Sequence, residues 1–122
     1  MSIPPPYKQA MSRYIDAFNA GDLEAILSLF AEKALVYSPT QAEPKAPRDF
    51  YPALLQRSVG TIFTMKTVFS GEKENMAAML FDYTKAKPDG TITFECVDIV
   101  TFDAVGKIAE MRIIFDTKKL GL

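Results

Sequence analysis

The second half of the chain consists of four long segments with strand character, joined by short turns. These segments cover residues 61–70, 74–86, 91–102 and 107–116. Lys87-Pro88-Asp89-Gly90 separates the second segment from the third, and Asp103-Ala104-Val105-Gly106 separates the last two; both are typical of tight turns. Because strands joined by short turns pair in opposite directions, the pattern predicts an antiparallel meander.

The first half of the chain carries helical periodicity instead. Apolar residues recur every three or four positions in two stretches, which are Ala10, Tyr14, Ala17 and Phe18, then Leu23, Ile26, Leu27 and Phe30. Gly21 suits the left-handed end of the first helix, and Asp22 suits the N-cap of the second. A short strand is expected at residues 34–38, and a third helix over about residues 49–57.

Helices followed by strands predict an α+β fold, with three N-terminal helices packed on one face of a curved antiparallel sheet. A length of 122 residues indicates one domain that spans residues 1–122. Its first six residues include Pro4-Pro5-Pro6, and we expect residues 1–6 to form a short extended arm.

The composition restricts the chemistry that the chain can perform. It contains no histidine and one cysteine. This excludes Ser-His-Asp and Cys-His nucleophiles, histidine-based metal sites and an internal disulfide. Proton transfer would have to use carboxylates, tyrosines, lysines or bound water. We therefore expect no metal site and no cofactor.

Charge and hydropathy exclude other classes of partner. Fourteen basic and fifteen acidic residues give a net charge of −1, and neither half of the chain is basic, so no nucleic-acid partner is expected. No apolar run approaches the length of a membrane span. The N-terminus lacks the basic and apolar regions of a signal peptide. A cytoplasmic location is therefore expected.

The strand predicted over residues 91–102 carries a carboxylate on its apolar face. Alternation places Ile92, Phe94, Cys96, Asp98, Val100 and Phe102 on that face. A buried carboxylate is costly unless it is paired, hydrogen-bonded or protonated, and desolvation favours the protonated form. Asp98 could therefore be a buried proton donor. It could also bond a backbone amide or a helix end, or be turned outward by a β-bulge.

Tyr14 lies on the apolar stripe of the first predicted helix, so its hydroxyl needs a buried partner. It could be an ordinary core tyrosine, or it could act together with Asp98 as one of two polar groups on facing surfaces. Cys96 is expected to be a small buried side chain without special reactivity.

The other strands place methionine and phenylalanine on the inner face. These inner residues are Phe63, Met65, Thr67 and Phe69 on the first strand, Ala77, Met79, Phe81 and Tyr83 on the second, and Met111, Ile113 and Phe115 on the last. Such residues fill a core by default, and they also suit the wall of a cavity for an apolar ligand. Their spacing does not distinguish the two uses.

Several segments together resemble the ketosteroid isomerases of the NTF2-like, or SnoaL-like, superfamily. The matching segments are Arg13-Tyr14-Ile15, Phe18-Asn19-Ala20-Gly21-Asp22-Leu23, Leu29-Phe30-Ala31, Val36-Tyr37-Ser38-Pro39, Asp49-Phe50-Tyr51, Val97-Asp98, Gly106-Lys107-Ile108, Met111-Arg112 and Phe115. They cover nearly the whole chain. The Phe-Asn-Ala-Gly-Asp segment is common across the superfamily, whereas the pair Tyr14 and Asp98 is more specific to the isomerase branch.

The resemblance implies a cone-shaped fold around one deep apolar pocket, and a homodimer. It implies that Tyr14 and a protonated Asp98 form an oxyanion hole for a dienolate, with Tyr51 supporting Tyr14. It also implies that Phe50, Met111 and Phe115 line the pocket. The expected ligand is a small apolar molecule with a carbonyl or phenolic oxygen, of steroid or polyketide type, and Ser38 and Cys96 are expected beside it.

Ser38 departs from the isomerase pattern. The isomerases carry an aspartate general base directly before the proline that matches Pro39, and this chain has Ser38 there. A serine without an activating partner is not a base near neutral pH. The ordinary isomerisation of 3-oxo-Δ5-steroids is therefore not expected to be efficient. The chain would be an isomerase- or lyase-like enzyme with another base, a non-catalytic binding protein, or a protein-interaction module.

Overall fold

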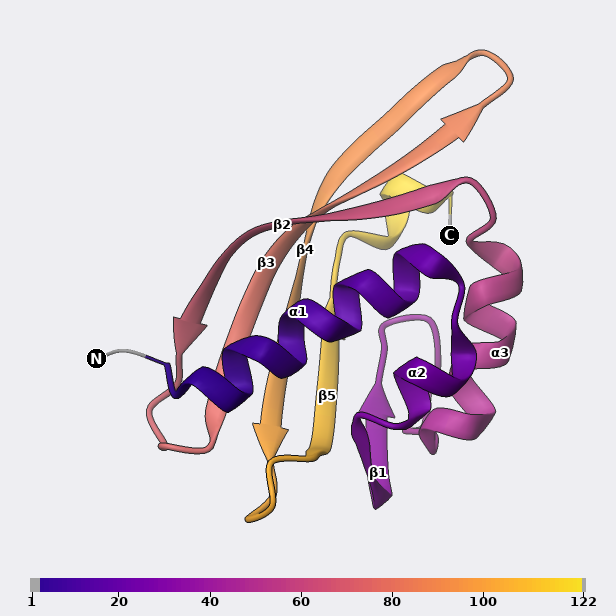
Figure 1. Ribbon diagram of the computed structural model, residues 1–122. Coiled ribbons are helices and arrows are strands. Elements are labelled where there is room, and N and C mark those ends of the chain that lie inside the picture. The colour runs from indigo at the N-terminus through magenta and orange to yellow at the C-terminus, as the bar shows by residue number, and fades with distance from the viewer. Residues whose placement is uncertain (1–2, 122) are drawn as a thin grey trace.

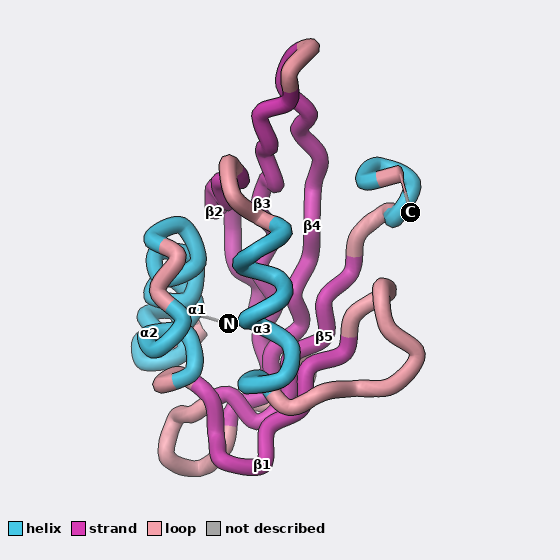
Figure 2. Tube along the Cα trace, turned by 90° about the vertical axis from the view of Figure 1, so that its right-hand side faces the viewer, coloured by secondary structure: helices cyan, strands magenta, loops and turns pink. Residues whose placement is uncertain are grey.

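The computed structural model describes residues 3–121 and confirms the α+β architecture. The helices are α1 (Pro5–Ala20), α2 (Leu23–Leu27) and α3 (Pro47–Arg57), and a 3₁₀ helix, η1 (Thr117–Leu120), follows the last strand. The strands are β1 (Phe30–Tyr37), β2 (Thr61–Ser70), β3 (Met76–Lys87), β4 (Gly90–Phe102) and β5 (Ile108–Ile114). The three helices pack on one face of the curved sheet (Figures 1 and 2).

The strands form one sheet in the order β1-β5-β4-β3-β2. The meander from β2 to β5 is antiparallel throughout, as predicted. The expectation of a purely antiparallel sheet is wrong, because β1 pairs with β5 in parallel. This parallel pairing places the N-terminal strand beside the C-terminal one. The connection through α3 then carries the chain from β1 at one edge of the sheet to β2 at the other.

Helix α1 begins earlier than the sequence indicates. The expected arm over residues 1–6 is wrong for Pro5 and Pro6, which form the first turn of α1, while residues 1 and 2 lie outside the described part. A first turn tolerates proline because its amides have no partner within the helix. The backbone amide of Tyr7 starts the helical bonding by donating to the carbonyl of Pro4 at 3.0 Å.

Two other element boundaries also shift. Helix α2 ends at Leu27, so Phe30 opens β1 instead of closing the helix, and the strand expected at residues 34–38 runs from Phe30 to Tyr37. Helix α3 begins at Pro47 and includes Pro52 in its interior. It buries Phe50 and Tyr51 against the sheet side of the domain.

A β-bulge in β2 changes which side chains face inward. Met65 pairs with Phe81 and Thr67 with Leu80, which leaves Lys66 as an extra residue. Lys66 lies on the outer face, where its Nζ is 2.9 Å from Glu95. Alternation reverses after the bulge, so the expectation that Phe69 faces inward is wrong, and its side chain is 52% exposed.

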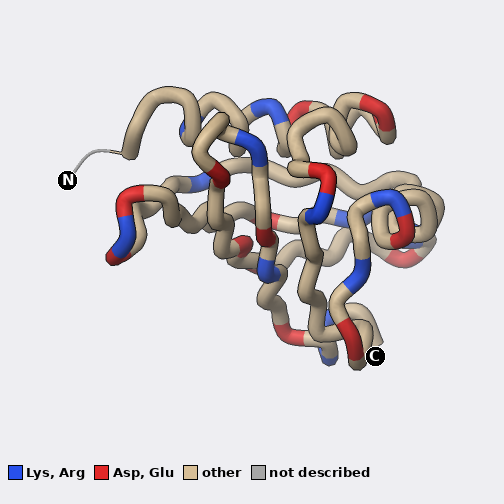
Figure 3. The backbone as a smooth tube through the Cα atoms, turned by 90° about the horizontal axis from the view of Figure 1, so that it is seen from below, with Lys and Arg blue, Asp and Glu red and all other residues tan. Residues whose placement is uncertain are grey.

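Basic and acidic residues are interspersed along the chain when the molecule is viewed from below (Figure 3). Among residues 3–121, no helix has both the length and the apolar character needed to cross a membrane.

Candidate active site

A pocket of about 560 Å³ lies between the sheet and the helices. Its walls combine inner-face strand residues with side chains from α1, α3, the loop after β1 and η1. The lining residues are Tyr14, Ser38, Pro39, Thr40, Phe50, Leu54, Arg57, Ser58, Phe63, Phe81, Tyr83, Lys85, Phe94, Cys96, Asp98, Ile113, Phe115, Thr117 and Leu120. A second hollow of about 340 Å³ lies beside it, over the loop after β1 and the end of β5. The volume of the larger pocket is typical of small-molecule sites.

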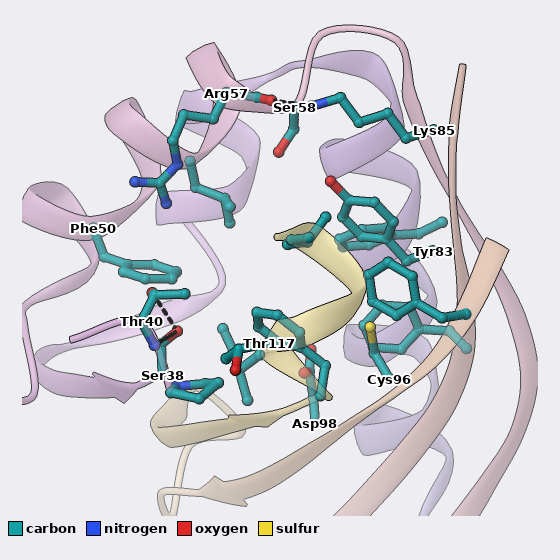
Figure 4. Close-up of a pocket in the computed structure, with 18 of the residues that line it drawn as sticks. Ser38, Thr40, Phe50, Arg57, Ser58, Tyr83, Lys85, Cys96, Asp98 and Thr117 are labelled. Atoms are coloured by element: carbon teal, nitrogen blue, oxygen red, sulfur yellow. Dashed lines mark hydrogen bonds between the residues drawn. The ribbon is translucent and has the colours of Figure 1, made fainter. Parts of the chain in front are cut away.

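Asp98 lies at the inner end of the pocket on β4, with its carboxyl group directed into the cavity (Figure 4). Its side chain is 1% exposed, and neither carboxyl oxygen has a hydrogen-bond partner among the described residues. The two alternatives of a backbone hydrogen bond and an outward turn are therefore not realised. Burial raises the pKa of Asp98 from 3.8 to about 8. A carboxyl group with this pKa is mostly protonated at neutral pH and can then donate a hydrogen bond.

Tyr14 projects from α1 to the same pocket and meets Tyr51 from α3. The two hydroxyl oxygens are 2.9 Å apart, and the rings meet edge-on with centroids 5.9 Å apart. Both side chains are fully buried. Burial, followed by the neighbouring Tyr51 and Asp98, raises the pKa of Tyr14 well above its usual value. The Tyr14 hydroxyl therefore keeps its proton throughout the neutral range and can donate a hydrogen bond.

Tyr51 and Met111 are not among the lining residues, although Tyr51 contacts the hydroxyl of Tyr14. The expectation that Met111 lines the pocket is therefore wrong. The Tyr51 hydroxyl donates to the sulfur of Met111 at 3.3 Å. A hydroxyl has one proton, so Tyr51 cannot donate to Met111 and to Tyr14 at the same time. When Tyr51 bonds Met111, the proton in the Tyr14–Tyr51 bond comes from Tyr14.

We expect Tyr51→Phe to lower the free energy of unfolding by about 1–2 kcal/mol, because the change leaves the buried Tyr14 hydroxyl without its partner. Urea unfolding monitored by circular dichroism measures the difference. Tyr7→Phe is the matched control: the Tyr7 ring stacks on Phe102 with centroids 4.2 Å apart. No hydrogen bond joins the Tyr7 hydroxyl to another described residue. Equal effects of the two substitutions would contradict the assigned role of the Tyr51 hydroxyl.

Comparisons with known proteins place this arrangement in a family. The model of the SnoaL-like domain matches residues 11–111. The chain belongs to the SnoaL-like domain family. A steroid Δ-isomerase from Nocardioides simplex is 34% identical over 109 residues, which cover 86% of this chain and 85% of the isomerase. The SnoaL-like domain described here is thus a relative of the ketosteroid isomerases.

Solved structures of more distant sequence share the fold. Rv0760c from Mycobacterium tuberculosis, in complex with estradiol-17β-hemisuccinate, has a TM-score of 0.76 at 17% identity, over 93% of this chain and 96% of that one. A putative polyketide cyclase from Xanthomonas campestris pv. campestris has a TM-score of 0.76 at 16% identity, over 98% and 96% of the two chains. The cone-shaped NTF2-like architecture therefore applies to this SnoaL-like domain.

Ser38 lines the pocket of the SnoaL-like domain, but its hydroxyl already has a partner. The hydroxyl oxygens of Ser38 and Thr40 are 2.8 Å apart (Figure 4). The Ser38 oxygen also accepts a hydrogen bond from the backbone amide of Thr40 at 3.3 Å. None of these contacts would turn the hydroxyl into a base.

The other predicted residues occupy the wall. Phe50, Cys96 and Phe115 line the pocket. Cys96 precedes Asp98 by two residues on the same face of β4, and burial raises the pKa of its thiol to about 12. The thiol is therefore protonated near neutral pH and is a poor nucleophile.

Several lining residues were not predicted from the sequence. Arg57, Ser58 and Thr117 come from the end of α3 and from η1, which carry no periodic signal that would show their direction. Lys85 lies on the inner-face alternation that contains Phe81 and Tyr83, so extending that alternation would have identified it. These residues matter because they bring polar and charged groups to a largely apolar pocket.

Proposed function

We propose that this SnoaL-like domain binds an apolar carbonyl or phenolic compound and holds its oxygen between Tyr14 and Asp98. The observation that carries the proposal is the buried carboxyl group of Asp98, with both oxygens unpartnered and facing the cavity. An unpartnered buried polar group is costly, and a ligand oxygen that accepts its proton would relieve that cost.

The same two donors would favour an enolate over its parent ketone. Negative charge on the oxygen strengthens hydrogen bonds from Tyr14 and protonated Asp98, and the apolar surroundings increase the effect. Stabilising an enolate lowers the barrier to proton removal from the adjacent carbon. Phe63, Phe81 and Phe94 provide flat apolar surfaces against which a polycyclic body would pack.

The relatives support a polycyclic ligand. One is a steroid Δ-isomerase, one is a putative polyketide cyclase, and the structure of Rv0760c holds an estradiol ester. We therefore propose a steroid- or polyketide-like ligand with a carbonyl or phenolic oxygen. A homodimer and a cytoplasmic location remain predictions from the sequence.

Any reaction would need a base other than residue 38. Water or a basic group of the substrate would have to accept the proton, because Ser38 bonds Thr40 and has no activating partner. The absence of a base at this position equally favours a second candidate function, a binding protein that holds its ligand without turnover. A protein-interaction role finds no such support, because it does not use the buried Asp98.

Binding of 2-naphthol tests the proposal, because its absorbance and fluorescence report hydrogen bonding and ionisation. We expect Tyr14→Phe and Asp98→Leu each to weaken binding by about tenfold or more, since each removes a hydrogen bond to an oxygen with anionic character. Asp98→Asn should weaken binding by a smaller factor than Asp98→Leu, because the amide group still donates a hydrogen bond. Tyr7→Phe is the control. Absence of binding up to about 1 mM, or binding that neither substitution weakens, would overturn the proposal.

A further inference from the structure

Two cations lie at the end of the pocket opposite Asp98. Arg57 is the last residue of α3 and Lys85 lies near the end of β3, and both line the cavity (Figure 4). The Lys85 Nζ donates to the backbone carbonyl oxygen of Arg57 at 3.2 Å, which holds the two residues at the same rim. Within residues 3–121 the ion pairs are those of Lys66, so neither Arg57 nor Lys85 has an acidic partner.

Two hydroxyl groups accompany these cations. Ser58 follows Arg57 and is 8% exposed, and its hydroxyl has no hydrogen bond to the rest of the described chain. The hydroxyl of Tyr83 accepts from Thr61 at 3.5 Å and retains its own proton. In Figure 4 the Ser58 and Tyr83 hydroxyls point toward the same upper part of the cavity. Four potential hydrogen-bond donors therefore lie at this end of the cavity, and the one carboxyl group among the lining residues, that of Asp98, lies at the other end.

The charge inside the pocket is unbalanced. Among the lining residues, only Arg57, Lys85 and Asp98 carry groups that are charged or close to titrating at neutral pH. With Asp98 protonated, the lining bears two positive charges and no negative one. Arg57 is exposed and Lys85 is half-buried, so the two cations lie at the mouth of the pocket, where they attract an anion and where salt weakens that attraction.

We propose that the ligand is an elongated amphiphile that carries an anionic group, such as a carboxylate, sulfate or phosphate ester, bound at Arg57 and Lys85. Its other end carries the oxygen that faces Tyr14 and Asp98. This orientation rests on the proposed function, whereas the anion site rests on the arrangement of Arg57, Ser58 and Lys85. Guanidinium suits such groups because it binds two of their oxygens at once.

Matched neutral and anionic probes test the anion site. The short pair is 6-hydroxy-2-naphthoate and its methyl ester, and the long pair is estradiol 17-sulfate and estradiol. We expect the anionic member of at least one pair to bind about tenfold tighter at low ionic strength, and the preference to shrink at about 0.5 M salt. Fluorescence titration or calorimetry gives both affinities.

Variants show whether the preference arises at the proposed residues. Arg57→Gln/Lys85→Gln should reduce the anion preference to within about twofold and leave the neutral probe nearly unaffected. Lys8→Gln/Lys73→Gln removes the same charge from exposed positions outside the pocket lining and should retain the preference. The single substitutions Arg57→Lys and Lys85→Arg conserve the charge and should keep most of the anion preference. Near-ultraviolet circular dichroism verifies that each variant is folded.

Each outcome bears on one proposal or the other. Three results would overturn the anion site. The first is an anionic probe that binds no tighter than its neutral partner in both pairs. The others are anionic probes that do not bind at concentrations up to about 1 mM, and an anion preference that survives Arg57→Gln/Lys85→Gln. Asp98→Leu should weaken neutral and anionic probes equally. If Asp98→Leu changes neither probe while the anion preference persists and depends on Arg57 and Lys85, the donor clamp fails and the anion site stands.

Discussion

Replacing Ser38 with aspartate is expected to raise isomerisation of a 3-oxo-Δ5-steroid by about 10²–10⁴-fold above a wild-type rate close to background. The residue lines the pocket and precedes Pro39, the position at which the isomerases that the chain resembles carry their general base. A carboxylate there would take the proton from the carbon beside the carbonyl, while Tyr14 and Asp98 hold the resulting enolate oxygen.

Two carboxyl groups would then share one pocket in different protonation states. Ser38 is half-buried near the loop after β1, so a carboxylate introduced there retains contact with water and stays ionised. Asp98 is enclosed and protonated, and a nearby negative charge would raise its pKa further. The variant would thus have a base and an acid with well-separated pKa values.

The rise in ultraviolet absorbance of the conjugated enone measures this gain. Ser38→Asn matches the size of the new side chain without supplying a base and should stay at the wild-type rate. Adding Asp98→Leu to Ser38→Asp should remove most of the gain. Rapid turnover by the wild type, or equal rates for Ser38→Asn and Ser38→Asp, would show that residue 38 does not limit the reaction.

Asp98 is expected to make the folded state more stable in mild acid than at pH 8. The carboxyl group ionises near its ordinary pKa of 3.8 in the unfolded chain, whereas burial raises that pKa to about 8 in the folded one. Between these values the folded state binds one more proton, so the free energy of unfolding falls as pH rises. Over the three units from pH 5 to 8, the loss due to Asp98 is about 4 kcal/mol.

Urea unfolding at pH 5, 6, 7 and 8 measures this dependence for the wild type and for Asp98→Asn, whose side chain has nearly the same size and does not titrate. Near-ultraviolet circular dichroism verifies that the substitution keeps the native packing. The other titrating groups are common to both proteins, so the difference between the two curves isolates Asp98. Asp16→Asn, at an exposed position on α1, is the control and should follow the wild type. Parallel curves for the wild type and Asp98→Asn would contradict a raised pKa at this residue.

Features set by local alternation could be predicted from the sequence. The period of two on β4 correctly placed Asp98 on the buried face, and the short turns correctly predicted the meander. The same rule failed at Phe69, because the extra residue Lys66 reverses the alternation and no property of the sequence marks the bulge. Prediction from alternation therefore holds only while pairing is regular.

Features set by packing between distant segments could not be predicted. The parallel pairing of β1 with β5 joins segments from opposite ends of the chain and has no local signal. The same holds for the mouth of the pocket, where Arg57 and Lys85 meet from a helix end and a strand end. Tyr51 was expected to support Tyr14, but its contact with Met111 depends on where the packing of α3 brings Tyr51 relative to β5, which no local pattern shows.

The single proton of Tyr51 has two alternative acceptors, the sulfur of Met111 and the hydroxyl oxygen of Tyr14. Under the proposed function, a ligand oxygen would accept the hydrogen bond of Tyr14 and leave the Tyr14 oxygen free to accept one from Tyr51. Because a thioether sulfur is a weak acceptor, turning the Tyr51 proton from Met111 to Tyr14 would cost little and would strengthen the bond from Tyr14 to the ligand. The buried tyrosine pair would thus favour ligands whose oxygen carries more negative charge.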